Sequence, residues 1–208
     1  IVEAVTERGV YWAMQTLRQL AEKRNSKTHI QGAEIIDWPA FRVRGFMQDV
    51  GRSYISLDEL KREIAALAKF KINVFHWHLT ENQSWRLESK IFPMLNDSAN
   101  TTRMPGKYYT LEEAKELVAF CKAHHMTLIP EIDMPGHSAA FIRTFRHDMQ
   151  SPDGMKILKL LMDEVCETFD VPYLHIGTDE VQFTNPRFVP EMVSYVRSKG
   201  KKVISWNP

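Results

Sequence analysis

Two adjacent carboxylates, Asp179 and Glu180, follow an apolar segment over residues 173–177 and have the types and spacing that acid–base chemistry needs. Neighbouring side chains within a strand point to opposite faces, so both acids can address one ligand only where the strand becomes a loop; Gly177 permits that change. Carboxyl groups held close together split their pKa values, so that one keeps a proton near neutral pH while the other is ionised. Glycoside hydrolysis uses such a pair, whereas a solvated helix start is the simpler interpretation of an isolated Asp-Glu dipeptide.

A second group of candidate residues lies in the segment 75–86, where His76 and His78 are expected on one face of a strand. Sugars stack on aromatic rings and offer hydroxyls to acids, so Trp85 and Glu81 favour a carbohydrate site. Two histidines at positions i and i+2 can also share a metal ion, as in metal-dependent hydrolases. A structural histidine pair with satisfied hydrogen bonds is the third interpretation, and the spacing alone leaves all three open.

A third group follows the next predicted strand, where Pro135 and Gly136 set a turn. His137 comes directly after this turn and is expected either to serve a ligand or to cap the following helix. Glu131 and Asp133 are suited to orient that histidine from behind. The residues alone do not choose between the two roles.

Strand-like and helix-like stretches alternate from about residue 41 onward, which predicts parallel strands connected by helices. The expected strands cover residues 41–50, 72–79, 127–132, 173–177 and 202–206. Ser56 with Glu59, and Thr110 with Glu113, form two capping boxes that open helices between these strands.

Periodicity alone cannot choose between an eight-stranded (β/α)8 barrel and a doubly wound open sheet. The polar candidates favour the barrel because they cluster just after the strands, where barrel enzymes collect their chemistry. These residues are Asp49, His78, Glu81, Asp133, His137, Asp179 and Glu180. No glycine-rich phosphate loop follows the first strand, which weakens a nucleotide-binding sheet. We therefore predict an α/β fold of the TIM-barrel type, with about five β-α units visible.

The composition is that of a globular chain with one sizeable core, since 44% of the 208 residues are hydrophobic. Lys and Arg number 27 against 26 for Asp and Glu, so no electrostatic field favours nucleic acid or an anionic membrane. No apolar run approaches the roughly 20 residues that a membrane span needs. Cys121 and Cys166 lie in predicted helices and are expected to be free thiols.

The first part of the chain is expected to belong to a different unit. Residues 6–23 have apolar side chains at helical spacing, and a polar connector follows over residues 25–31. We predict that residues 1–38 are the C-terminal tail of a preceding domain, which the family resemblance described below implies to be a small α/β domain. Residues 39–208 are then the N-terminal part of the catalytic barrel.

Taken together, four segments resemble the strand motifs of the β-N-acetylhexosaminidases, glycoside hydrolase family 20. They are Arg44 to Arg52, His76 to Thr80, Pro130 to His137 and His175 to Glu180, in the family's order. Residues 9–20 also resemble the last helix of the small α/β domain that precedes the barrel in this family.

The resemblance implies a (β/α)8 barrel and a retaining, substrate-assisted mechanism, in which the acetamido oxygen of the substrate displaces the leaving group. Asp179 would orient the amide and stabilise the intermediate, while Glu180 would protonate the departing oxygen and later activate water. The residues implied to bind substrate are Arg44, His137, Glu81 and Trp85, with Asp49, His78 and Asp133 in support. No metal or organic cofactor is implied. The implied partner is a glycan or glycoconjugate that bears N-acetylglucosamine or N-acetylgalactosamine.

Two departures from the family pattern concern the site itself. Thr178 stands where the family more often has a second glycine, and Glu81-Asn82 replaces a commoner Asp-Asp. The first change bears on the turn before the acids, and the second on the role of Glu81.

The family's barrel continues through three further strands, so the sequence is expected to be a fragment. An open sheet edge predicts self-association, which size-exclusion chromatography would detect. A non-catalytic carbohydrate-binding role for this fragment, and a metal-dependent hydrolase built on His76 and His78, remain the alternatives. The resemblance also suggests an extracytoplasmic setting, periplasmic, secreted or lysosomal.

Overall fold

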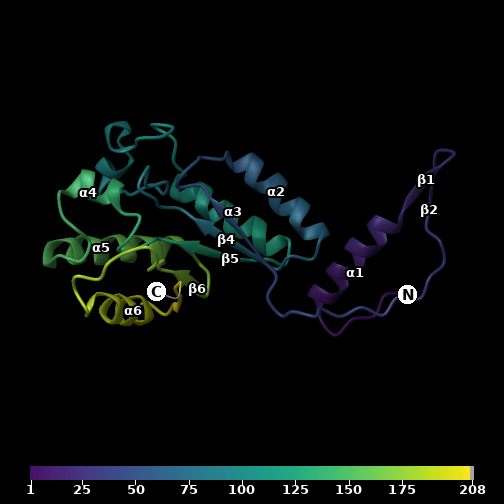
Figure 1. Cartoon of the computed structure of the whole chain (residues 1–208). Helices are drawn as coiled ribbons and strands as arrows, with labels where there is room; N and C mark the ends of the chain where they lie inside the picture. Colours follow the sequence, from purple (N-terminus) through teal and green to yellow (C-terminus); the bar gives the residue numbers. More distant parts are fainter. Residues whose placement is uncertain (207–208) are drawn as a thin grey trace.

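A five-stranded parallel sheet forms the centre of the chain in the computed structural model, which describes residues 1–206 (Figure 1). The strands are β3 (Gly45–Asp49), β4 (Val74–His78), β5 (Thr127–Glu131), β6 (Tyr173–His175) and β7 (Lys202–Ile204). They are neighbours in sequence order, each pairing in parallel with the next. A doubly wound sheet reverses its strand order, so this unbroken order agrees with the predicted barrel arrangement.

The connecting helices cover one face of this sheet. They are α2 (Leu57–Lys69), α3 (Leu111–Ala123), α5 (Pro152–Thr168) and α6 (Phe188–Ser198). The short helix α4 (Ala139–Phe145) packs against two 3-10 turns, η1 (Pro93–Asn96) and η2 (Ser98–Asn100). Phe75 and Trp77 on β4 are fully buried in the same core cluster as Leu60 and Leu117 from the helices. Both predicted capping boxes are confirmed at the starts of α2 and α3.

The other face of the sheet carries polar side chains. Because side chains alternate along a strand, His76 and His78 point away from the helices that cover Phe75 and Trp77. Glu131 on β5 and His175 on β6 join them there. In a barrel this face becomes the interior.

The predicted first strand is shorter than expected at its start. Asn73 explains this, because its side chain takes the place of a strand partner. Its amide oxygen accepts from the Arg44 backbone N–H (2.7 Å), and its amide nitrogen donates to the Arg42 carbonyl (2.7 Å). Regular strand pairing therefore begins at Gly45.

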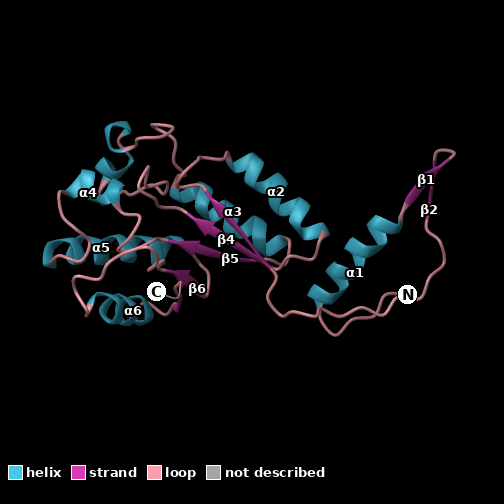
Figure 2. Cartoon of the chain, in the orientation of Figure 1, coloured by secondary structure: helices cyan, strands magenta, loops and turns pink. Residues whose placement is uncertain are grey.

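The first 38 residues form a separate group of elements at one end of the molecule (Figure 2). The helix predicted over residues 6–23 is present as α1 (Glu7–Leu20), which is capped by Thr6 and ends before the predicted end because Glu22–Arg24 form a strand. It reaches the barrel portion through Gln19, whose side-chain amide donates to the Lys69 carbonyl (2.8 Å).

The prediction of a plain polar connector over residues 25–31 is wrong. An antiparallel hairpin of β1 (Glu22–Arg24) and β2 (Lys27–His29) occupies this stretch. Asn25 and Ser26 both have positive φ, 50° and 62°, which is the geometry of a two-residue hairpin turn of type I′. The stretch has no apolar face and no glycine in the turn, so it carries no strong hairpin signal.

Both cysteines are free, as predicted. Within residues 1–206, no helix is long and apolar enough to cross a membrane.

Candidate active site

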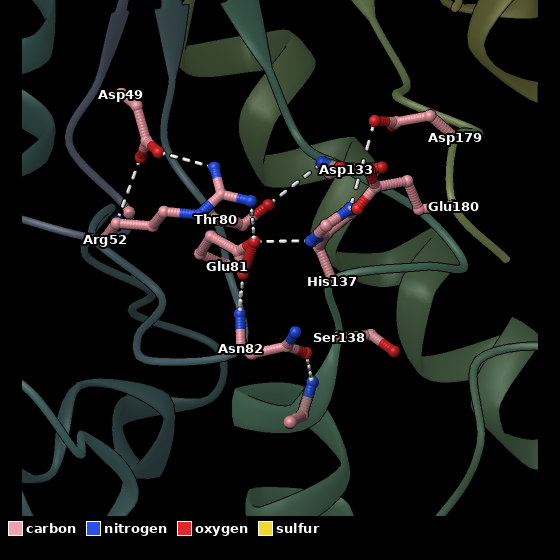
Figure 3. Close-up of polar contacts among 12 residues, drawn as sticks. Asp49, Arg52, Thr80, Glu81, Asn82, Asp133, His137, Ser138, Asp179 and Glu180 are labelled. Atoms are coloured by element: carbon pink, nitrogen blue, oxygen red, sulfur yellow. Dashed lines mark hydrogen bonds and ion pairs between the residues drawn. The ribbon is translucent and has the colours of Figure 1, made fainter.

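The carboxyl ends of β3, β4, β5 and β6 bring together most of the residues singled out in the sequence (Figure 3). Asp49 ends β3, and Glu81 follows β4 by three residues. Asp133 and His137 follow β5. Asp179 and Glu180, the remaining two, follow β6. The barrel topology thus collects at one edge side chains that lie far apart in the sequence.

Glu81, His137 and Glu180 form a continuous polar chain. Glu81 is 1% exposed, and its Oε1 forms a hydrogen bond with Nδ1 of His137. The other ring nitrogen of His137, Nε2, lies 3.4 Å from Oε2 of Glu180 and 3.9 Å from Oδ2 of Asp179. A buried carboxylate on one nitrogen fixes the imidazole tautomer and directs the second nitrogen at the catalytic candidates. His137 therefore contacts the acids rather than capping α4.

Arg52 is a site residue that the sequence reasoning did not single out. Its guanidinium lies 2.7 Å from Oε1 of Glu81 and 2.6 Å from Oδ2 of Asp49. Burial acts to lower the pKa of Arg52, but Asp49 and Glu81 outweigh it and raise that pKa. Asp49 supports the site through this arginine. Its position three residues before Arg52 was the only local indication that the two side chains form an ion pair.

Asp133 is 1% exposed and is held by two hydrogen bonds, one through its backbone and one through its side chain. Its N–H donates to Oγ1 of Thr80 (2.9 Å), and its Oδ1 accepts from the N–H of Thr178 (3.2 Å). Burial, followed by the charges of Glu131 and Asp179, raises the pKa of Asp133 to about 7.

The turn that presents the acid pair uses an unusual backbone. Gly177, Thr178 and Glu180 all have positive φ, 67°, 89° and 49°. The Thr178 hydroxyl donates to the Trp206 carbonyl (3.1 Å), which anchors the turn against the residues after β7. As a result the Asp179 side chain is 35% exposed and that of Glu180 is 75% exposed. Both acids can therefore be reached from solvent.

Gly177→Ala tests whether this turn requires glycine. A Cβ at Gly177 would lie 1.6 Å from Oδ1 of Asp133, whereas a Cβ at Gly106, where φ is also positive (71°), would meet nothing within 4 Å. Both substitutions incur the left-handed backbone penalty, about 1–2 kcal/mol. We expect Gly177→Ala to cost about 1–3 kcal/mol beyond Gly106→Ala in chemical unfolding of the full-length protein. Equal losses of stability for the two variants would contradict the proposed clash.

Below the acid pair, Glu131 is the hub of a buried polar cluster. Its Oε2 lies 2.8 Å from Nε2 of His76 and 2.7 Å from Nδ1 of His78, and its Oε1 lies 3.0 Å from Nδ1 of His175. The indole N–H of Trp206 donates to Oε1 (2.9 Å). A metal ion shared by His76 and His78 would have to displace their contacts with this carboxylate.

The cluster also shifts the protonation of its members. Glu131 is fully buried, which alone would raise its pKa, but the contacts with His175, His76 and His78 hold the pKa below its usual range. Burial lowers the pKa of His78, yet the hydrogen bond to Glu131 outweighs it and raises that pKa. The cluster therefore keeps an ionised carboxylate beneath the site.

Two predicted substrate-binding residues lie apart from this group. Arg44 is at the amino end of β3, where its guanidinium donates to the carbonyls of Lys71 and Phe41 (both 2.7 Å). Trp85 is 3% exposed and belongs to the hydrophobic core. Their roles toward a sugar stay predictions.

Sequential parallel β-α units with acids and a histidine at the strand ends define a protein of the barrel class, with its candidate site at the carboxyl ends of the strands. Residues 41–151 match the profile of Glycosyl hydrolase family 20, catalytic domain, and residues 1–38 match that of Glycosyl hydrolase family 20, domain 2. The chain belongs to glycosyl hydrolase family 20. The family resemblance read from the strand motifs is thereby confirmed, as is the fold class, a partial TIM barrel.

The relatives are longer proteins. A beta-hexosaminidase of Porphyromonas gingivalis is 37% identical over 206 residues, with 83% of this chain and 26% of the relative covered. A beta-hexosaminidase of Vibrio furnissii is 34% identical, with 86% and 35% covered. The crystal structure of a beta-N-acetylhexosaminidase of Bacteroides fragilis superposes with a TM-score of 0.87 at 31% identity, with 99% and 49% covered. The chain thus spans half or less of each of these proteins.

Proposed function

We propose that the protein containing this chain is a β-N-acetylhexosaminidase that removes terminal N-acetylglucosamine or N-acetylgalactosamine by a retaining, substrate-assisted mechanism. The observation that carries the proposal is the series of side-chain contacts from Glu81 through His137 to Glu180, with Asp179 beside it. Membership of family 20 supports it. So does the related exo-β-N-acetylglucosaminidase of Vibrio harveyi, solved in complex with N-acetylglucosamine, which superposes with a TM-score of 0.86 at 29% identity, with 99% of this chain and 42% of that chain covered.

The proposed reaction assigns proton transfer to Glu180 and stabilisation of the intermediate to Asp179. The acetamido carbonyl oxygen of the substrate attacks the anomeric carbon, and the glycosidic bond breaks as Glu180 gives its proton to the departing oxygen. Asp179 accepts from the amide N–H and stabilises the positive charge of the oxazolinium intermediate. Water then attacks the anomeric carbon, and Glu180 takes up its proton. The sugar is released with its original anomeric configuration.

His137 and Glu81 hold Glu180 in position during the proposed reaction. The Glu180 side chain is more exposed than those of Glu81 and Asp179, so its position depends on the contact with Nε2 of His137. Glu81 holds the far side of the imidazole, and Arg52 holds Glu81 in turn. A carboxyl that changes protonation twice in each turnover benefits from such a constant partner.

The test compares two substrates of the full-length protein, a nitrophenyl β-N-acetylglucosaminide and the matching β-glucoside, which lacks the acetamido group. Because the nucleophile belongs to the substrate, we expect kcat/KM for the glucoside to be lower by at least about a thousandfold. Similar values for both substrates would exclude substrate assistance. Sugar binding without turnover would favour the binding-module alternative, and activity lost to a chelator and restored by zinc would favour the metal-dependent one.

We further propose that the domain boundary lies between residues 38 and 39.

We also propose that the isolated chain self-associates. In the described residues β3 and β7 are the two edges of the five-stranded sheet. Unpaired strand edges template contacts between chains, so we expect the elution volume of the isolated chain in size-exclusion chromatography to fall with concentration. A stable monomer across a hundredfold range of concentration would contradict this.

A further inference from the structure

Asp133 and Asp179 each have one buried carboxylate oxygen without a hydrogen-bond partner among the described residues, Oδ2 of Asp133 and Oδ1 of Asp179. Side-chain oxygens of the two residues lie within 4.8 Å of each other. A buried polar atom left unpaired costs about 1–3 kcal/mol, and two carboxylates this close also repel. A proton on one carboxyl would remove the repulsion, and a hydrogen bond from it to the other would also satisfy the unpaired oxygens.

We propose that Asp133 stays protonated in the resting enzyme and donates a hydrogen bond to Asp179, which makes it a positioning residue for the carboxylate that orients the acetamido group. No bond of the substrate forms or breaks in this step, and the proton remains on Asp133 throughout. The inference rests on the proposed function, because it gives Asp179 its role toward the amide.

Burial decides which of the two acids holds the proton. Asp133 is 1% exposed and Asp179 35%, so the ionised form is less costly for Asp179. Four groups face Asp133 from the elements around it. The charges of Glu131 and Asp179 raise its pKa, those of His137 and His78 lower it, and burial is the largest influence. The resulting pKa of about 7 leaves Asp133 mostly protonated at about pH 6 and about half protonated at pH 7.

The surrounding backbone leaves Asp133 little freedom to turn away. Thr80 accepts from its N–H, and the N–H of Thr178 donates to its Oδ1, so only Oδ2 is free to carry the proton. The absence of a side chain at Gly177 makes room for this carboxyl. The arrangement is therefore built from three strand ends, those of β4, β5 and β6.

The pH dependence follows from the sign of this shift. The active form has Asp133 protonated, so activity falls as pH rises through about 7 and Asp133 ionises beside Asp179. We expect the ionisation of Asp133 to contribute to the alkaline limb of kcat/KM in the wild type.

The experiment uses the full-length protein with three substitutions. Asp133→Asn keeps a donor that never ionises, and we expect its kcat/KM at about pH 6 to stay within about tenfold of the wild type, with a less steep alkaline limb. Asp133→Leu removes the donor, and we expect a loss of about a hundredfold. Asp170→Asn, at an exposed position paired with Lys122, is the matched control and should leave the profile unchanged.

Infrared spectroscopy without substrate supplies a readout that does not depend on turnover. The wild-type spectrum minus that of Asp133→Asn should show the carbonyl stretch of a protonated carboxylic acid at about pH 6, and this difference band should fade above about pH 7. Absence of that band from a folded, active wild type overturns the inference and leaves the proposed function standing. Equal damage from Asp133→Asn and Asp133→Leu, both folded by circular dichroism, also overturns it. A band present in an inactive wild type would instead remove the proposed function, and the positioning role with it.

Discussion

Glu180→Gln is expected to lower kcat/KM of the full-length protein about a thousandfold for substrates with a sugar leaving group. The substitution keeps the size of the side chain and a possible contact with His137, 3.4 Å away, but removes the acidic proton. A positioned general acid contributes about 10²–10⁴-fold to such a reaction. The measurement is release of N-acetylglucosamine from a β-linked disaccharide.

The leaving group separates this chemical role from a structural one. A nitrophenolate departs with little help from an acid, so the deficit of Glu180→Gln in kcat/KM should shrink with a nitrophenyl substrate. Glu112→Gln, on an exposed position of α3, is the matched control and should leave both activities unchanged. A deficit of the same size for both leaving groups would mean that Glu180 does not protonate the departing oxygen.

The strands and the turn before the acid pair were predictable from the sequence because both are local features. Strand periodicity and capping boxes involve residues within a few positions of one another, and the five strands and both caps are confirmed. The turn at Gly177 follows from one glycine before two acids. The convergence of strand ends was also predictable, because parallel β-α units always place their carboxyl ends at one edge.

Pairings across long stretches of chain were not predictable in the same way. Glu81 and His137 are 56 positions apart, and nothing local indicates that Arg52 contacts the same Glu81 oxygen as the histidine. The sequence analysis predicted that Trp85 binds sugar, but aromatic residues occur both in hydrophobic cores and in binding sites. Only packing shows that this ring is 3% exposed.

The contacts in the buried cluster around Glu131 were also not predictable from the sequence. They lead to the second prediction with a large effect, which concerns stability. The sequence left His76 and His78 open between a structural pair, a sugar site and a metal site. The structure gives both of them Glu131 as a partner, with His175 on the other carboxylate oxygen. Removing one member of a buried charged group is costly, since the remaining polar atoms lose their compensation and stay out of water.

Glu131→Gln is therefore expected to destabilise the full-length protein by about 3–5 kcal/mol near pH 6, measured by chemical unfolding. The pKa of Glu131 is lowered in the folded state, so its stabilisation is present above the unfolded value, about 4.3, and fades as pH falls below it. The pKa of His78 is raised, so its contribution is complete below about 6.5 and fades as pH rises through the folded value.

The deficit of Glu131→Gln should consequently be largest between about pH 4.3 and pH 6.5 and shrink on both sides. Glu63→Gln is the matched control, because Glu63 is half-buried on α2 and burial raises its pKa. Its replacement by a neutral side chain should leave stability unchanged or raise it slightly at neutral pH, the opposite sign. A deficit of Glu131→Gln that does not vary with pH would mean that the cluster acts through packing and hydrogen bonds alone. The charge of Glu131 would then have no part in holding the strand ends beneath the acid pair.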